Sequence, residues 1–573
     1  MEGSHVSSMS RSVLMADALR KYKIVIGYLI FAAFLVGVFI SRDKVLQCSL
    51  AVGGIVVLWT LEPIPYHVTS FVPLVIFPVS SLLPAKDVAM RYMNDDIIRA
   101  LSGLFISILL QTSKLNRRMA LYLLLAMGTN VRKLLFCYMF FVFLFAMLVT
   151  DAAVTAIMVS LVDTLVAELY ASKVRLRVAK INKVTEEARL KPKDGEEGRG
   201  AVDGQDAPAY AEYDNVLHEE QTHCAVLRKA FMLALSYAAV YGGSALLASR
   251  PSFIMESFLE EQYGYTISEF SWVLVNVAFG IVGLIFAWVF IFYIFLRKFD
   301  EDGTEDPSSA REVCRGKLDQ LGEMTMNEVI VTGLFVVCVA LWVTRKPHIV
   351  PGWQDYLKLR LVSESTVGFF VVIVAFLLPS DFHNFELKNR ILKWNDVYHK
   401  MPWGVIFVMS GNIAISYALV ECGVITGLND LAKHISPNHV WAQLFFLFVS
   451  SIASEVTTVK DRLPALYEVA GNASQAMDMR PLHLLLPTAA GSDFNFMMPS
   501  SGARNAIIFE IAYISSLEMI LPGLVMKLVS CILYFGVFNS IAVAVMGIDE
   551  QLTAVNATSA ATTVSRFFVH AEQ

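Results

Sequence analysis

Four charged residues lie inside stretches of the chain that are otherwise apolar. They are two acids, Asp151 and Glu455, and two arginines, Arg250 and Arg504. A lone charge at bilayer depth costs several kcal/mol, so such residues persist mainly when they are paired. A guanidinium can also hold a carboxylate with two parallel N–H bonds. These residue types therefore indicate ion pairs, and they suggest the recognition of a small anion.

The composition places these charges in a membrane protein. The chain has 573 residues, of which 56% are hydrophobic and 17% charged, and its mean hydropathy is +0.56. Soluble domains carry about 25% charged residues. Seven scattered cysteines do not form a disulfide framework, and a net charge of -5 argues against nucleic-acid partners. We find no nucleophile with a neighbouring base within a span, so we predict no catalytic residue and no enzyme.

The elements that must position the four charges are membrane helices. Roughly ten to twelve crossings are expected from runs near spanning length. Three shorter runs, 49–59, 71–83 and 97–110, contain Gly, Pro or flanking charges and suggest broken helices or re-entrant hairpins. The clear apolar runs are about Ile24–Ile40, Leu134–Val149, Phe231–Leu247, Trp272–Leu296, Glu328–Val343, Ser365–Pro379, Val405–Val420, Ala442–Ile452 and Ala506–Val543.

Polar segments divide these spans. We expect residues 1–23 to be a cytoplasmic tail, because Arg11, Arg20, Lys21 and Lys23 precede the first helix. Residues 24–171 and 230–297 would form a first membrane region, separated by a polar cytoplasmic loop at 172–229 whose part Lys193–Gln205 should be disordered. A polar loop at 298–327 would precede a second membrane region, 328–545.

The C-terminal tail, 546–573, carries a possible glycosylation site. Asn556 begins the sequon Asn-Ala-Thr, and its glycosylation would make this tail extracellular. The sequon at Asn472 is a rival, and sequons of this form are common by chance.

The two membrane regions resemble one another in the order of their breaks. Each has an apolar run, 101–111 or 403–415, then a polar interruption, 150–152 or 454–456, then a Gly- or Pro-marked break, 242–244 or 499–501. Interrupted segments at matching places of two halves point to a transporter's binding site at the membrane midplane.

Several motifs identify a family at this point. Trp59–Pro65 with Val68-Thr69-Ser70 and Pro73, Leu341–Arg345 with Pro351-Gly352-Trp353, Val397–Val405, and Phe496–Pro499 with Asn505-Ala506-Ile507 occur in the family's order. From about Leu50 to Val545 the chain resembles the divalent-anion/sodium symporter family, solute carrier family 13, which transports dicarboxylates, citrate and sulfate with sodium.

The resemblance implies an all-α multi-pass protein of two inverted repeats, each with a re-entrant hairpin. A scaffold domain would hold a homodimer while a transport domain carries a small anion across the bilayer by an elevator motion. The plasma membrane is the family's usual location. Sodium is the expected co-transported ion, and no other cofactor or metal is implied.

The family's site residues can be carried over position by position. Two Ser-Asn-Thr motifs at the hairpin tips bind substrate carboxylates, and small-residue loops in the broken helices help to bind sodium. The corresponding substrate-binding candidates are Thr150, Asp151, Ala152, Ser454, Glu455, Val456 and Asn505. The corresponding cation-site candidates are Gly242, Gly243, Ser244, Arg250, Ser501 and Arg504.

This chain departs from the family at four of these positions. Both motif asparagines are acids, Asp151 and Glu455, and each partner loop contains an arginine, Arg250 or Arg504. Our hypothesis pairs Asp151 with Arg250 and Glu455 with Arg504, each guanidinium standing where relatives bind sodium. Because arginine stays charged and cannot leave, the hypothesis predicts sodium-independent uniport or exchange of a di- or tricarboxylate such as succinate or citrate.

Other interpretations remain open at this stage. The four charges could mark a transport-incompetent sensor or scaffold, could lie in watery cavities without pairing, or could reflect a misaligned first loop. The carboxylates also leave room for a monoanionic, neutral or zwitterionic substrate. Three further charges, Lys460-Asp461-Arg462, replace apolar family residues and could pair with one another or extend to an interface.

A few polar residues are weaker candidates. Asn412, Asp493 and Asn495 could contact ligand, although packing or interhelical hydrogen bonding is the commoner role for such residues. Glu62 and His67 flank a Pro-rich break, where capping or pairing at the membrane edge is the structural alternative.

Overall fold

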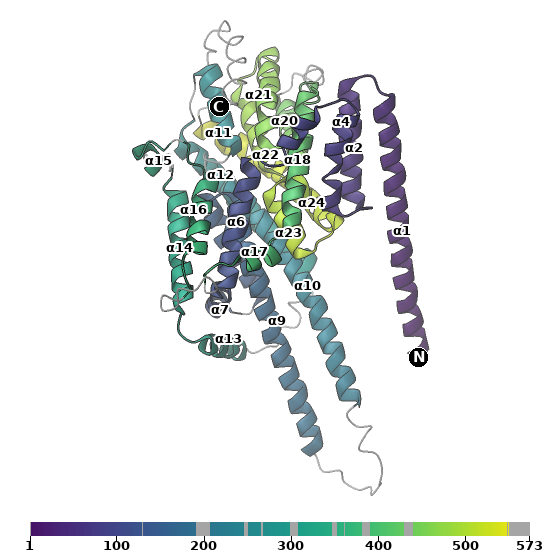
Figure 1. Cartoon of the computed structure of the whole chain (residues 1–573), viewed down its shortest axis with the longest axis vertical. Coiled ribbons are helices and arrows are strands. Elements are labelled where there is room, and N and C mark those ends of the chain that lie inside the picture. Colours follow the sequence, from purple (N-terminus) through teal and green to yellow (C-terminus); the bar gives the residue numbers. More distant parts are fainter. Residues whose placement is uncertain are drawn as a thin grey trace.

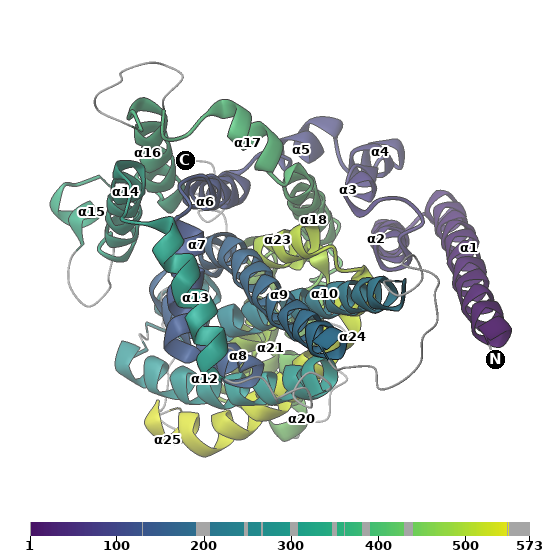
Figure 2. The same cartoon turned by 90° about the horizontal axis from the view of Figure 1, so that it is seen from below.

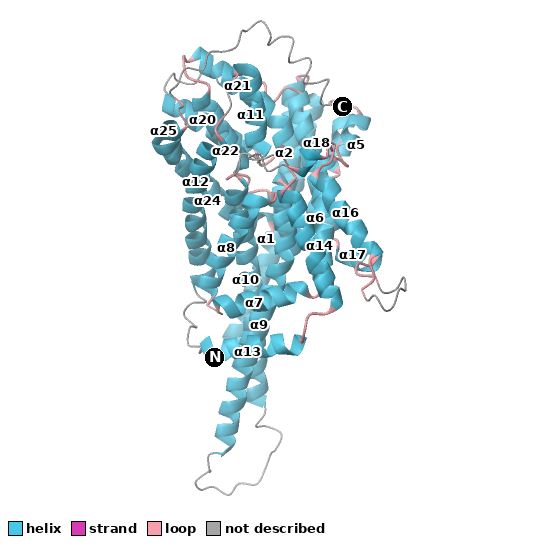
Figure 3. Ribbon diagram, turned by 90° about the vertical axis from the view of Figure 1, so that its left-hand side faces the viewer, coloured by secondary structure: helices cyan, strands magenta, loops and turns pink. Residues whose placement is uncertain are grey.

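The fold was analysed as a computed structural model. It describes residues 2–128, 130–190, 207–245, 250–264, 267–297, 307–345, 352–359, 361–380, 390–428, 439–546 and 548. Every regular element in these ranges is a helix (Figure 3). The all-α class predicted from the sequence is therefore confirmed for the described part of the chain.

Among the described residues, nine helices are long and apolar enough to cross a membrane. A tenth crossing is possible if Ala85–Thr112 and Leu115–Met127, which meet at 77°, form one broken span. The shortest of the nine have 18 residues, or about 27 Å of helix, which is close to the thickness of the hydrocarbon core. The multi-pass prediction is confirmed, and the described residues contain nine candidate spans, or ten with the broken one, against the ten to twelve expected.

Two of the three runs predicted to be broken are continuous helices. Residues 49–59 lie inside α2 (Lys44–Leu61), and residues 97–110 lie inside α6 (Asp95–Thr112). The glycines taken as breaks in α2 serve packing instead: a Cβ on Gly53 would lie 2.9 Å from the ring of Phe34 in α1 (Glu2–Ile40). Only residues 71–83 are interrupted as expected, because α3 (Tyr66–Thr69) and α4 (Val72–Val79) are short.

In the first half, two helices meet at a tip inside the molecule. They are α8 (Val131–Leu148) and α9 (Asp151–Leu190), and they are followed by α10 (Ala207–Gly243), α11 (Arg250–Tyr263) and α12 (Glu269–Ile291). The polar segment predicted to be a loop is helical over 172–190 and 207–229, so α9 and α10 project well beyond the bundle (Figure 1). Its many Lys, Arg, Glu and Ala residues are strong helix formers. The segment Lys193–Gln205, predicted to be disordered, lies outside the described residues.

The second half repeats this order of elements. Helices α20 (His439–Ala453) and α21 (Val459–Ala476) meet at a tip, and a broken helix follows, α22 (Leu482–Asp493) and α23 (Ala503–Ala512), with a turn at Pro499–Ser501. Helix α24 (Ser516–Val537) completes the series. In Figure 1, α20 and α21 lie near the top while α9 and α10 extend to the bottom. The shared order agrees with a repeat, and its inverted symmetry stays a prediction.

The remaining helices flank this centre. Figure 2 shows α14 (Met326–Val343) and α16 (Glu364–Leu377) on one side and α1 and α2 on the other, with α9, α10 and α23 between them. Helices α17 (Trp394–Lys400) and α18 (Trp403–Glu421) and the short α5 (Ala85–Met90) connect the two sides. The polar segment 298–327, predicted to be a loop, contains α13 (Pro307–Leu321), which lies across the end of α7 (Leu115–Met127).

A buried arginine fastens α7 to the segment after α13. Arg118 donates Nε–H to Glu328 at 3.0 Å, and its two terminal nitrogens donate to the carbonyls of Leu321, Gly322 and Glu323 at 2.8–3.1 Å. Its side chain is 5% exposed. The neighbouring Arg117 is 47% exposed and shares its partner Glu168 with Lys317.

We expect Arg118→Ala to lower the thermal unfolding midpoint of the detergent-purified protein far more than Arg117→Ala. The first change leaves the buried Glu328 carboxylate without its cation, which typically costs about 3–5 kcal/mol. The second removes a largely exposed pair worth about 0–1 kcal/mol, and Lys317 still holds Glu168. Equal shifts for the two variants would contradict a structural role for the buried network.

Candidate functional site

A cavity of about 910 Å³ lies between the two halves. It is bounded by the tip of α9, by residues 239–244 of α10, and by the ends of α22 and α23, and on its other side by residues of α6, α14, α16, α18 and α21. Ligand pockets in proteins usually measure about 300–1,000 Å³. The cavity is therefore large enough for a small organic molecule.

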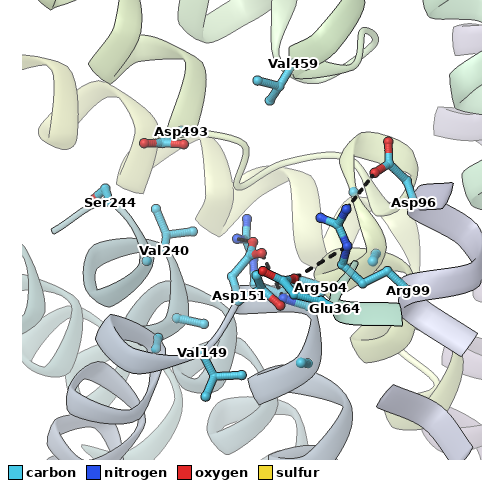
Figure 4. A pocket seen from close by; sticks show the side chains of 18 of the residues that line it. Asp96, Arg99, Val149, Asp151, Val240, Ser244, Glu364, Val459, Asp493 and Arg504 are labelled. Carbon is cyan, nitrogen blue, oxygen red and sulfur yellow. Dashed lines mark hydrogen bonds and ion pairs between the residues drawn. The ribbon is translucent and has the colours of Figure 1, made fainter. Parts of the chain in front are cut away.

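An ion pair crosses this cavity wall between the two halves. Arg504, at the start of α23, places Nη1 2.7 Å from Oδ2 of Asp151, the first residue of α9 (Figure 4). The arginine side chain is 4% exposed and that of Asp151 45%. The negative charge of Asp151 also lies at the positive end of the α9 helix dipole. The carboxylate faces the cavity while its cation lies behind it.

Four of the five N–H donors of Arg504 are used. Besides Asp151, the guanidinium donates to Oγ of Ser236 at 3.2 Å and to both the backbone oxygen and Oδ1 of Asn495 at 3.0 and 2.7 Å. These contacts fix the guanidinium between α10, the broken helix of the second half and the tip of α9. One N–H of Nη1 remains for another acceptor.

The second acid has a partner that the sequence did not suggest. Glu455 lies 2.6 Å from Nζ of Lys527 in α24, and the two side chains are 7% and 1% exposed. Glu455 also accepts the backbone N–H groups of Phe496, Met497 and Met498 at 2.8–3.2 Å. Lys527 donates further to the carbonyl of Ser451. Glu455 is thus a buried carboxylate, neutralised by Lys527, that holds the loop following α22 in place through its hydrogen bonds.

The predicted pair of Glu455 and Arg504 is therefore wrong, and the predicted pair of Asp151 and Arg250 is untested. Arg504 reaches Asp151 of the other half rather than Glu455, because α23 packs against α9, and Glu455 is neutralised by Lys527. The side chain of Arg250 lies outside the described part of the chain, so its predicted role is untested. Lys527 could have been found as the one basic residue inside the apolar segment Ser516–Val545.

The other predicted site residues fall into two groups. Thr150, Asp151, Ala152, Gly243, Ser244, Ser501 and Arg504 line the cavity. Ser454, Glu455, Val456, Asn505 and Gly242 are absent from its lining. The first motif therefore faces the cavity, and the second motif does not.

The residues outside the lining have structural roles. Ser454 donates to the carbonyl of Ser451, and Asn505 donates to Ser501 and to the carbonyls of Asn495 and Met498, which holds the broken helix in shape. A Cβ on Gly242 would lie 2.2 Å from the carbonyl oxygen of Phe143, so a glycine lets α10 approach α8 there.

A second cluster of charges, not predicted from the sequence, lines the opposite side of the cavity. Arg99 lies 2.7 Å from Asp95 and 3.5 Å from Glu364, and Glu364 lies 3.4 Å from Arg345. Lys460 of α21 lies 3.5 Å from Asp96, so this side also contacts the second hairpin. Their separation along the sequence, 95 to 460, gave no sign that they meet.

The weaker candidates divide in the same way. Asn412, Asp493 and Asn495 line the cavity. Glu62 accepts the N–H of Ser516 at 2.6 Å and so caps the start of α24. This is the capping role that was the structural alternative to ligand contact. His67 is half-buried in α3, away from the cavity lining. Asn556 lies outside the described residues, so its glycosylation stays a prediction.

The three charges after the second motif, all within the described residues, do not form ion pairs with one another. Arg462 is fully buried and donates to Thr457 and to the carbonyl of Ser492, whereas Asp461 accepts from Thr458 at 2.6 Å. Lys460 reaches Asp96 of α6. Each of the three thus has a separate contact.

Comparison with known proteins agrees with this arrangement. Residues 24–547 match the family described as the sodium:sulfate symporter transmembrane region. The sodium-dependent low-affinity dicarboxylate transporter 1 of Caenorhabditis elegans is 23% identical over 531 residues, covering 89% of this chain and 90% of the relative. The sodium-dependent dicarboxylate transporter SdcS of Staphylococcus saprophyticus is 27% identical, with 86% and 85% covered, and the Na(+)/citrate cotransporter of Mus musculus is 24% identical, with 91% and 95% covered. The chain therefore belongs to the sodium:sulfate symporter family and is a multi-pass membrane transporter, not an enzyme.

Proposed function

We propose that this protein carries di- or tricarboxylates, such as succinate or citrate, across the membrane without sodium. The relatives are named as dicarboxylate and citrate transporters, which supports the substrate class. The same names say that those relatives depend on sodium. The charges around the cavity support a different ion requirement for this chain.

The ion pair of Arg504 and Asp151 carries the proposal. A guanidinium stays protonated at any accessible pH, and Arg504 is attached to the chain and held by four hydrogen bonds. Lys527 likewise accompanies Glu455 as a covalently attached cation. Cations that cannot leave the protein cannot drive a cycle by binding on one side and dissociating on the other.

The cavity wall offers groups suited to a carboxylate. Residues 150–153 at the start of α9 and 502–504 at the start of α23 both line the cavity. Backbone N–H groups at helix N-termini favour anions. The remaining N–H of Arg504 could join them. We assign substrate binding to these two helix starts.

The motion that we propose is the family's elevator. The two hairpins and the two broken helices would move together with the substrate, and α1, α2, α14, α16 and α18 would form the scaffold of a homodimer. The paired charges between α9 and α23 support movement of the two halves' inner helices as one unit.

The test is uptake of radiolabelled succinate, citrate and sulfate into proteoliposomes, with sodium or with choline in its place. The proposal expects uptake of a carboxylate at the same rate in both media, faster when the vesicles are preloaded with unlabelled substrate. A several-fold stimulation by sodium would overturn the ion requirement. Absence of uptake in every condition would overturn the transport of these substrates and favour a sensor or scaffold.

A further inference from the structure

One of the acids that line the cavity has no hydrogen-bond or ion-pair partner among the described side chains. Asp493 is the last residue of α22 and lines the cavity, and its carboxylate makes no hydrogen bond or ion pair with the described residues. In Figure 4 it lies across the cavity from the pair of Asp151 and Arg504. The other two acids of this region, Asp151 and Glu455, each have a cation within 2.7 Å.

The position of Asp493 disfavours a negative charge. It lies at the C-terminal end of α22, where the helix dipole is negative. It is also partly buried, and burial of a lone carboxylate is costly. Proton uptake removes both costs at once.

The nearest cations do not neutralise Asp493 directly. Arg462 and Arg504 interact with it electrostatically, and so does the like charge of Asp151. Arg462 is fully buried, and its hydrogen bonds to described residues go to Thr457 and to the carbonyl of Ser492, not to this carboxylate. Arg504 is occupied by Asp151 and Asn495.

The helices packed on α22 add few further charges. Tyr467 of α21 and Tyr534 of α24 also interact with Asp493. Lys527 of α24 is engaged by Glu455, and the titratable residue of α20 is His439 at its first position. The described titratable side chains of α11 are Glu256, Glu260, Glu261 and Tyr263.

We propose that Asp493 is a proton-binding site and that the protein moves a proton together with its carboxylate substrate. Asp151 and Glu455 are each paired with a cation, so Asp493 is the acid of this group whose charge no ion pair balances among the described residues. A proton from the water on one side binds to a carboxylate oxygen of Asp493 and removes one negative charge from the cavity wall, which favours binding of the anion. The proton is released to the water on the other side after the substrate leaves.

Linkage makes this coupling reciprocal. A proton on Asp493 favours binding of the anion, and the bound anion favours the proton to the same extent. The inference rests on the proposed carboxylate transport. In it the proton is the exchangeable cation, a role that the covalently attached Arg504 and Lys527 cannot fill.

The experiment compares the full-length wild type with Asp493→Asn in proteoliposomes, using labelled succinate and citrate and a pH dye in the lumen. For the wild type, an outside pH one unit below the inside should raise uptake several-fold, and substrate entry should acidify the lumen. One pH unit corresponds to about tenfold in a one-proton equilibrium. Asp493→Asn, whose amide cannot bind and release this proton, should lose both the acceleration and the acidification.

Asp461→Asn is the matched control, because Asp461 lies on the neighbouring helix, accepts from Thr458 and is not part of the cavity lining. It should respond to the pH gradient as the wild type does. The proton site would be wrong if the pH gradient accelerated uptake by Asp493→Asn, or if it had no effect on uptake by the wild type. Either result would leave the proposed carboxylate transport intact. If sodium stimulated uptake by the wild type but not by Asp493→Asn, the proton site would be wrong and Asp493 would belong to a sodium site instead. Absence of exchange by the wild type in every condition would instead overturn the proposed transport.

Discussion

Arg504→Ala is expected to reduce carboxylate uptake by at least about 30-fold while the protein still reaches the membrane. Removing one partner of a buried, hydrogen-bonded charge pair typically costs about 2–5 kcal/mol, which is about 30-fold or more in an equilibrium. The change removes the cation behind Asp151 and the four hydrogen bonds that join α23 to α9, to α10 and to Asn495 after α22. Initial rates of labelled succinate uptake, normalised to reconstituted protein, measure the effect.

Two companion variants separate charge from geometry. Arg504→Lys keeps the positive charge, but one ammonium cannot contact Asp151, Ser236 and Asn495 together. We expect the uptake rate of Arg504→Lys to lie between those of the wild type and Arg504→Ala. Arg345→Ala is the matched control, since Arg345 lines the same cavity but is 22% exposed and lies 3.4 Å from its acid, Glu364. If Arg345→Ala were as damaging as Arg504→Ala, the special role of the cross-half pair would be wrong.

The sequence predicted which residues meet at the cavity better than which residues pair. Asp151 and Arg504 could be identified because a charge in an apolar stretch is rare and both stand at breaks in helices. Their pairing could not be predicted, because it depends on α23 of one half packing against α9 of the other. The prediction placed each arginine in its own half, where local order suggested it.

Local patterns also misled the prediction of helix ends. The polar segment that begins at residue 172 has no apolar periodicity. Its residues are nevertheless good helix formers, and α9 therefore continues through it to Leu190. Conversely, the glycines of α2 suggested a break, although they lie against Phe31 and Phe34 of α1. Helix propensity thus lengthens α9, and packing against α1 keeps α2 continuous. Hydropathy alone shows neither effect.

Lys527→Met is expected to destabilise the protein strongly, and Glu455→Gln combined with it is expected to restore most of the loss. Alone, the first change leaves the Glu455 carboxylate, 7% exposed, without a cation, at a typical cost of about 3–5 kcal/mol. In the double variant, the amide oxygen of Gln can still accept the N–H groups of Phe496 and Met497. Replacing a buried pair by neutral groups of similar volume is often neutral or stabilising.

Thermal unfolding midpoints in detergent would measure this, with Lys229→Met as the control. Lys229 lies 2.6 Å from Glu518, the same separation as in the buried pair, but the two side chains are 28% and 47% exposed. Its loss should cost only about 0–1 kcal/mol. An equal shift for Lys229→Met and Lys527→Met would contradict the importance of burial. Because Lys527 lies away from the cavity lining, the double variant should also transport without sodium. Transport that acquired a sodium requirement would mean that Lys527 occupies the position of an exchangeable cation rather than that of a structural one.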